Sequence, residues 1–373
     1  MTHSWCPDSE GELLLLAAIG DQATAGDAWA SWSASHVVSE LSLGAARLLP
    51  LIDHNLQQHG IGGLSGEAAE TLVAMWCELQ LLYHEAGEML RALEAAAVST
   101  IVLKGAAHAF LDYPDPFLRP MSDVDVLVRA GDVRRAVAAL RGSGWTPAGG
   151  STEALSPYQH GMSFTNGSGV AVDLHSRTIW QGTFLADDDR GFWERSVPLT
   201  LEGAACRALS PEDRLLHTCV HGTEWSPMLP IRWVADAAMI IRRHGGSLDW
   251  DRLVERARAR RLALPVAEAL TYLDEKCAIP VPHGPLNALC ATPASPLVRL
   301  THRVRTGREG SYLSHMNDWT VGWRLQRSPP VHRKLADFMT WFAASRGLRH
   351  VWQAPFSLGR TAVRVGVRLL RDR

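Results

Sequence analysis

The first part of the chain has the hydrophobic pattern of helices. From Glu10 to about Ala97 apolar residues recur at helical spacing, and the alternation typical of strands is absent. Glycines at positions 60, 62 and 63 separate the segments. We therefore expect residues 1–97 to form a helical N-terminal region.

The pattern changes to strands and short helices after residue 97. The β-branched run Thr100 to Leu103 predicts a strand, and the Lys-Gly pair after it leads into the helix-forming stretch AAHAF. SDVDVLV predicts a second strand, and RAGDVRRAVAALRGSG predicts a helix because its Val and Leu residues fall on one face. MSFT and VAVDLH, on either side of a turn at Asn166 to Gly169, predict a hairpin. Residues 98–205 are thus expected to form a small α/β core.

Helical patterns return in the last part of the chain. SPEDRLLHTCVHGTEW, RWVADAAMIIRRHG and SLDWDRLVERARARRL carry helix start signals, with Ser or Ser-Pro at the caps and acidic residues in the first turn. We expect residues 206–373 to form a helical C-terminal region. The predicted fold class is α+β, a small mixed-sheet core flanked by N-terminal and C-terminal helical regions.

The strand SDVDVLV carries two charges that a buried strand should lack. Successive side chains of a strand point to opposite faces, so Asp123 and Asp125 share one face and the valines between and after them share the other. Two carboxylates about 7 Å apart repel each other unless a cation lies between them. Carboxylate oxygens suit Mg²⁺ or Mn²⁺, so the pair predicts a metal site.

Asp173 adds a third acid. In VAVDLHS it alternates with Val172 and Leu174, so it also projects from the face opposite the apolar one. Three acids on neighbouring strands can hold two metal ions about 4 Å apart, which activates an attacking oxygen and neutralises a leaving phosphate. The alternative is that these acids cap turns or pair with Arg119 and Arg129.

Composition and charge limit the classes of binding partner that we expect for the protein. The 37 basic and 39 acidic residues give a net charge of −2, so no overall attraction to nucleic acid or to a membrane surface is expected. The 6 cysteines are scattered without a CxxC pair, which favours reduced thiols over a zinc knuckle or a disulfide framework. The N-terminus lacks a basic region before its short apolar run, so we expect a cytoplasmic protein without a transmembrane segment.

Several segments together resemble a known superfamily. IVLKGAAHAF, LRPMSDVDVLV, RAGDVRRAVAALRGSGW and VAVDLHS, in this order and spacing, are similar to the minimal nucleotidyltransferases related to DNA polymerase β, and more closely to a bacterial branch with an LKG…R-x-x-SD-x-D signature. LSPEDRLLHTCVHG and LPIRWVADAAMII also resemble that branch, so the resemblance covers roughly residues 98–280. Lys104-Gly105 stands where the superfamily usually has Gly-Ser.

The resemblance implies a role for each acid. Asp123 and Asp125 would bind the metals that hold the triphosphate of a nucleoside triphosphate (NTP). Asp173 would complete the second metal site and help to deprotonate or orient the acceptor hydroxyl. All three acids would thus be both catalytic residues and ligands of Mg²⁺ or Mn²⁺.

The resemblance also implies contacts to the nucleotide. Gly105 would let the backbone approach a phosphate at a helix N-terminus, where Lys104 adds a point charge. Arg119 would clamp a phosphate oxygen bidentately, and Ser122 would donate one more hydrogen bond. The plainer alternatives are an exposed strand-end lysine for Lys104 and a partner that only neutralises Asp123 for Arg119.

Histidines give weaker signals. His217 and His221 are four apart on a predicted helix and share a face with Glu224. Three interpretations stay open for the two histidines. They form a zinc site, contact phosphate or substrate, or form a packed, hydrogen-bonded pair. The sequence HTCVH lacks the glutamate of the zinc-binding motif HExxH. His175 shares a face with Asp173 and is either an orienting residue or an ordinary strand-end histidine.

Two further charged features have more than one interpretation. Arg232 and Asp236, four apart, form a helix ion pair or, if they face the cleft, contact the base or the acceptor. In the C-terminal segment, arginines lie on one face of a predicted helix and apolar residues on the other. This pattern is typical of a helix that packs on the protein through its apolar face and exposes its arginines to solvent. It is also typical of a basic helix that binds an acidic partner or a lipid surface. These arginines are Arg360, Arg364, Arg368, Arg371 and Arg373.

The predicted function is transfer of a nucleoside monophosphate (NMP) from an NTP to a hydroxyl or phosphate acceptor with release of pyrophosphate. A DxD glycosyltransferase that uses a nucleotide-sugar also explains a metal pair, but it predicts an α/β nucleotide-binding domain where this chain has helices. A catalytically inactive nucleotide-binding or regulatory module is the third hypothesis, and three costly carboxylates argue against it. Near-zero net charge favours a small-molecule or peptide acceptor over RNA.

Overall fold

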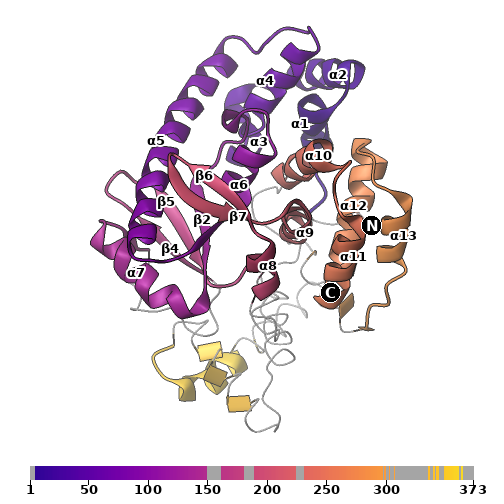
Figure 1. The fold of residues 1–373 in the computed structure, drawn as a ribbon. Helices are drawn as coiled ribbons and strands as arrows, with labels where there is room; N and C mark the ends of the chain where they lie inside the picture. The colour runs from indigo at the N-terminus through magenta and orange to yellow at the C-terminus, as the bar shows by residue number, and fades with distance from the viewer. Residues whose placement is uncertain are drawn as a thin grey trace.

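The computed structural model describes residues 5–148, 161–179, 189–223 and 231–296, and beyond these only 298–299, 302, 306, 335–336, 339–340, 342–343, 348–360 and 363 (Figure 1). Asp8 and Asp21 cap the first two helices by accepting hydrogen bonds from Gly11 N and Thr24 N. The N-terminal elements are α1 (Ser9–Ile19), α2 (Gln22–Ser33), the 3₁₀ turn η1 (Val38–Glu40), α3 (Leu43–Ala46), α4 (Leu49–Gln58) and α5 (Glu67–Ala95).

A mixed sheet follows. Within the described residues it has seven strands in the order β3-β4-β5-β2-β1-β7-β6, so β2 lies between β5 and β1. Its strands are β1 (Thr100–Leu103), β2 (Asp123–Val128), β3 (Thr146–Pro147), β4 (Gly161–Thr165), β5 (Ala171–His175), β6 (Val197–Leu201) and β7 (Ala204–Ala208). Between them lie α6 (Lys104–Leu111), the 3₁₀ turns η2 (Pro116–Leu118) and η3 (Ala130–Asp132), α7 (Val133–Gly142) and α8 (Arg190–Arg195).

The two faces of the sheet belong to different cores. Val124, Val126 and Val128 are fully buried in a core formed with α5 and α7. Leu127, on the other face of β2, packs into a second core formed by α9, the other C-terminal helices and the N-terminal helices. Figure 1 shows α5 and α7 on one side of the sheet and α9 on the other. Asp123 and Asp125 share the face of Leu127, so they point toward α9.

The C-terminal helices pack beside the N-terminal ones. Trp5 makes edge contacts with Trp233 of α10 and Tyr272 of α12, and α1 packs against both helices. None of the helices in the described ranges is long and apolar enough to cross a membrane. The elements are α9 (Pro211–Gly222), α10 (Arg232–His244), α11 (Trp250–Ala259), α12 (Ala263–Cys277), α13 (His283–Cys290) and the 3₁₀ turn η5 (Val351–Gln353).

The mixed sheet flanked by helices confirms the α+β fold class. The predicted strands at 100–103 and within 122–128 are present, and so is the hairpin, as the antiparallel pair β4 and β5. The β6–β7 hairpin is not foreseen by the sequence pattern. The division of the chain at residues 97 and 205 stays a prediction.

Candidate active site

Strand register brings two of the predicted acids together. β2 and β5 are parallel neighbours, and Asp125 is the direct partner of Asp173 in the ladder. Both side chains therefore project from the same face of adjacent strands, about 5 Å apart at the backbone. Asp123 lies two residues earlier on β2, opposite Ala171. Sequence alternation thus assigns the faces, while the register, which only the fold gives, makes Asp125 and Asp173 neighbours.

Lys104 reaches the same carboxylate from the other side. On β1, Leu103 is the ladder partner of Asp125, and Lys104 follows with a positive φ of 46° before the chain turns into α6. This left-handed backbone conformation is strained for a lysine. The Nζ atom of Lys104 lies 2.6 Å from Oδ1 of Asp125. Lys104 therefore lies at the site, as a counter-ion of Asp125 in this structure.

His175 completes the immediate surroundings of Asp125. Its Nε2 lies 2.7 Å from Asp125 Oδ1, and both residues are buried. Asp125, Asp173 and His175 each offer a ligand atom within 4.8 Å of the others, and among the described residues only this group meets that criterion for a metal site. The sequence predicts Asp123 as the third ligand. The group within 4.8 Å contains His175 and not Asp123, and the role of Asp123 as a ligand stays a prediction.

The acids differ in their electrostatics. Burial acts to raise the pKa of Asp125, but Lys104 and the hydrogen bond from His175 outweigh it and hold this pKa well below its usual range. Burial raises the pKa of Asp123, and the charges of Asp125 and Asp173 raise it further, against the weaker effects of Lys104 and Arg232. The pKa values of Asp123 and Asp125 are therefore shifted in opposite directions.

Gly105 and Ser122 lie at the edge of this cluster. A Cβ at Gly105 would stand 3.1 Å from Met121 Sδ and 3.5 Å from Arg119 Nη1, so a side chain at this position would crowd the loop that leads into β2. Ser122 is exposed, and its Oγ lies 3.4 Å from Asp123 Oδ1. The Ser122 hydroxyl is accessible to a ligand. At position 105, close packing explains why a glycine is present, and the sequence alone does not reveal this packing.

Arg119 is bound elsewhere than expected. Its Nε and Nη2 donate to Asp236 Oδ1 and Oδ2 at 2.6 and 2.8 Å, and its Nη1 donates to Pro120 O at 3.0 Å. Tyr113 donates to the same Asp236 carboxylate at 2.8 Å. Three N–H groups of Arg119 are thus used, and with 8% of its surface exposed the residue joins the loop before β2 to α10. The phosphate clamp stays a prediction. Asp236 pairs with Arg119, and no Arg232–Asp236 ion pair forms among the described residues.

The two histidines of α9 face different surroundings. His217 is buried, and burial, the nearby His221 and the charge of Lys104 lower its pKa well below the usual range, although Asp125 acts in the opposite sense. His221 is exposed and stacks on His217 with ring centroids 6.2 Å apart. The neutral His217 thus lies within electrostatic reach of the acids, in agreement with a packed pair beside the site. Glu224 lies outside the described residues.

A buried polar network fixes α6, which begins at Lys104. Asp112 Oδ2 accepts from His108 Nδ1 at 2.8 Å, and both carboxylate oxygens accept from Arg214 of α9 at 3.0 and 2.6 Å. His244 of α10 lies 3.0 Å from Asp112 Oδ1, and Thr218 contacts His108 Nε2 at 3.0 Å. Three helices around the site are therefore joined through one carboxylate.

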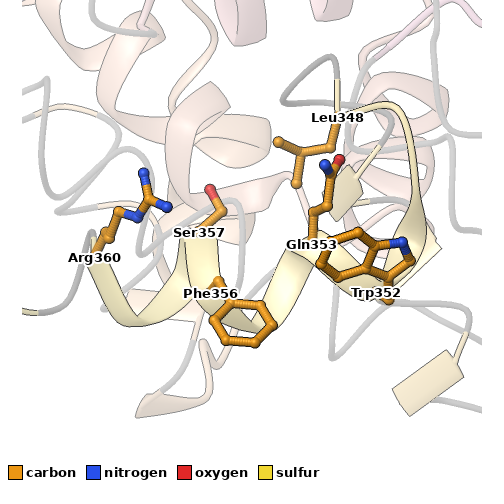
Figure 2. Close-up of a pocket in the computed structure, with 6 residues that line it drawn as sticks. All are labelled: Leu348, Trp352, Gln353, Phe356, Ser357 and Arg360. Atoms are coloured by element: carbon orange, nitrogen blue, oxygen red, sulfur yellow. The ribbon is translucent and has the colours of Figure 1, made fainter.

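A pocket far along the chain takes no part in this site. Figure 2 shows its lining, to which the segment 348–360 contributes the exposed Trp352 and Phe356 together with Arg360. Its volume is about 570 Å³. No residue predicted for the metal or nucleotide site lines it. Arg364, Arg368, Arg371 and Arg373 lie outside the described residues, so the hypothesis of a docking C-terminal helix stays a prediction.

Similarity to known proteins identifies the family of the chain. No curated protein matches the sequence. One solved structure, of an antigenic nucleotidyltransferase-like protein from Paracoccidioides brasiliensis, matches over 58% of this chain and 95% of that protein, with 15% identity and a TM-score of 0.35. The family described as uncharacterised nucleotidyltransferase matches residues 43–276, which include α3 to α12 and every acid of the site. The chain therefore belongs to this family of nucleotidyltransferases.

Proposed function

We propose that the protein transfers an NMP from an NTP to a hydroxyl or phosphate acceptor and releases pyrophosphate. The observation that carries the proposal is the adjacency of Asp125 and Asp173 on neighbouring strands, with His175 beside them, in a chain of the nucleotidyltransferase family. The same family membership gives no support to a nucleotide-sugar donor.

The donor set fits a divalent metal. Asp125, Asp173 and His175 can each supply one ligand atom. The pKa of Asp123 is raised by burial and by the charges of Asp125 and Asp173, and a nearby cation would lower it. Two carboxylates suit Mg²⁺ or Mn²⁺, and the imidazole nitrogen favours Mn²⁺ over Mg²⁺, which prefers oxygen. Bound there, the metal would lower the pKa of the acceptor hydroxyl and stabilise charge on the α-phosphate.

The chain's own residues then have defined tasks. Asp173 is half-buried and open to the cleft, so it is suited to accept a proton from the acceptor hydroxyl or to orient it. The Lys104 ammonium, at the first residue of α6, adds positive charge where phosphate oxygens would approach Asp125. Ser122 offers a hydroxyl beside Asp123, and His221 offers an exposed ring on α9. A small molecule or a peptide is the proposed acceptor.

Label transfer tests the reaction. The protein is incubated with Mg²⁺ or Mn²⁺, a cell extract as the source of acceptors, and each NTP labelled at either the α- or the γ-phosphate. We expect α-label, and not γ-label, on an acceptor, and a loss of at least about a hundredfold in Asp125→Asn and Asp173→Asn. Glu88→Gln, at an exposed carboxylate of α5, serves as the matched control.

The outcomes separate the alternatives. Movement of γ-label alone would identify a kinase. Transfer that persists at the wild-type rate in both Asp variants would show that these carboxylates do not act in it. Binding of NTP without transfer of either label would leave a nucleotide-binding module.

A further inference from the structure

Arg47 belongs to the N-terminal helices but lies next to the loop that leads into β2. It directly follows α3, between the buried Ala45 and Leu48, which share a core with Tyr113 and Leu118 of that loop. The following helix, α4, packs on η2, the turn that contains Leu118. Packing of apolar neighbours thus holds Arg47 beside the loop that leads to Asp123, whose charge acts on the Arg47 guanidinium.

Arg232 reaches the same loop from the C-terminal helices. It is the first residue of α10, and its Nη1 donates to Pro120 O at 3.1 Å. Arg119 Nη1 donates to the same carbonyl oxygen at 3.0 Å, so two guanidinium groups meet there. Asp236 neutralises Arg119 through two hydrogen bonds, whereas the charge of Arg232 has no such carboxylate. Arg232 is therefore held in position by a neutral acceptor.

Arg47 and Arg232 are buried or half-buried cations near Asp123 that form no ion pair with a described residue. Arg47 is 9% exposed, and in the described parts of the chain its guanidinium makes no hydrogen bond or ion pair. Burial lowers the pKa of Arg47, with Asp123 acting against it. Burial together with the charges of Arg119 and Arg47 lowers the pKa of Arg232 to about 9. Asp125 is already bound by Lys104 and His175. The carboxylates of Asp123 and Glu78 act on the pKa of Arg47, and those of Asp236 and Asp123 act on the pKa of Arg232, but none of them forms an ion pair with either arginine in the described residues.

We propose that Arg47 and Arg232 form an anion subsite beside Asp123 that holds the polyphosphate tail of the nucleotide, the part that leaves as pyrophosphate. Buried cations without partners are costly, and an anion that enters between them removes the cost. A guanidinium fork binds phosphate oxygens bidentately. A polyphosphate carries several phosphate groups, so it can offer oxygens to both guanidinium groups at once.

This subsite rests on the proposed function for its position in the reaction, but its ligand can be tested without turnover. The probe is pyrophosphate with Mg²⁺, titrated calorimetrically into the full chain, with adenosine as the probe that lacks phosphate. We expect Arg47→Gln and Arg232→Gln each to weaken pyrophosphate binding about tenfold or more, and the double variant to weaken it further. Adenosine binding should not change. Arg91→Gln, at an exposed arginine of α5, should bind pyrophosphate like the wild type.

Pyrophosphate affinities within twofold of the wild type in both Gln variants, or no binding of pyrophosphate by the wild type, would overturn the proposal. Melting curves identify variants that do not fold. For those, Arg47→Lys and Arg232→Lys keep the charge but lose the fork, and unchanged affinity in them also counts against the subsite. The α-label assay on the wild type reports the reaction separately. Absence of transfer with arginine-dependent pyrophosphate binding refutes only the reaction, and transfer with arginine-independent binding refutes only the subsite.

Discussion

Asp125 lies in the middle of a sheet with 5% of its surface exposed. An unpaired carboxylate there would cost several kcal/mol. Lys104 and His175, at 2.6 and 2.7 Å from the same oxygen, offset that cost. The charge of Asp125 is therefore tolerated because Lys104, which follows β1, and His175 of β5 lie against it. Lysine and histidine are also residue types that bind phosphates or metals.

The histidine in this group gives a test of the ligand set. We expect His175→Ala to weaken Mn²⁺ binding about tenfold to a hundredfold, because it removes one of three donors within 4.8 Å. Mn²⁺ affinity can be measured by electron paramagnetic resonance of the free ion. If Asp123→Ala weakens Mn²⁺ binding and His175→Ala leaves it unchanged, the three-aspartate set predicted from the sequence is the correct one.

At the residue scale, the sequence predicts which side chains face the polar side of a strand better than it predicts which residues they contact. Alternation alone puts Asp123, Asp125 and Asp173 on the polar faces of their strands. The partner of Arg119 is 117 residues away, and no local pattern points to Asp236. His175 could have been proposed as a ligand from its i, i+2 spacing to Asp173 on one strand face.

Elements with clear periodicity are the ones that sequence analysis finds. β1, β2 and the β4–β5 hairpin carry β-branched or alternating residues, and the structure confirms them. β6 and β7, VPLTL and AACRA, contain a proline and several alanines, which are poor strand signals. The pairing of β7 with β1, and so the place of β6 at the edge of the sheet, depends on tertiary contacts that the local sequence does not encode.

The Asp112 network permits a stability test at the element scale. Arg214→Met leaves the carboxylate buried without its bidentate partner, so we expect a loss of about 3–5 kcal/mol in the free energy of unfolding. Urea denaturation measures it. The control, Arg135→Gln, breaks an exposed Arg–Asp pair and should cost less than about 1 kcal/mol. Equal losses in the two variants would contradict a structural role for the network.

The same network predicts a pH dependence. Burial acts to raise the pKa of Asp112, but His108, His244 and Arg214 hold it well below its usual range. A carboxyl group with a lowered folded-state pKa stabilises the protein fully above its unfolded pKa of about 3.9, and this stabilisation is lost as the pH falls toward the folded value. The stability difference between wild type and Asp112→Asn should therefore be constant near neutral pH and narrow below about pH 4. A difference that widens in acid would contradict this assignment.

At the scale of the whole molecule, the N-terminal helices are part of the C-terminal core. The family match begins at residue 43, yet Leu14, Leu15, Ile19 and Trp32 are almost fully buried in the core that contains α10 and α12. Burial of four such side chains contributes about 6–12 kcal/mol. That is comparable with the whole stability of a domain, about 5–15 kcal/mol.

A chain that starts at residue 43 should therefore be unstable. We expect residues 43–373 to be largely insoluble, or to melt at least about 10 °C lower than the full chain, because α1 no longer covers α10 and α12. Soluble yield and thermal melting of the two chains measure the effect. Equal melting temperatures of the two chains would mean that α1 and α2 do not stabilise the fold.

The sheet order also has a consequence for how the protein is made. β1 pairs with β7, which follows it by about a hundred residues, so on the ribosome β1 waits roughly 5–20 s for this neighbour. Until then the β1 edge beside Lys104 is unpaired, and unpaired edges are where nascent chains associate wrongly. The strand that leads to Lys104 thus has an exposed edge during synthesis, and β7 is the strand that covers this edge.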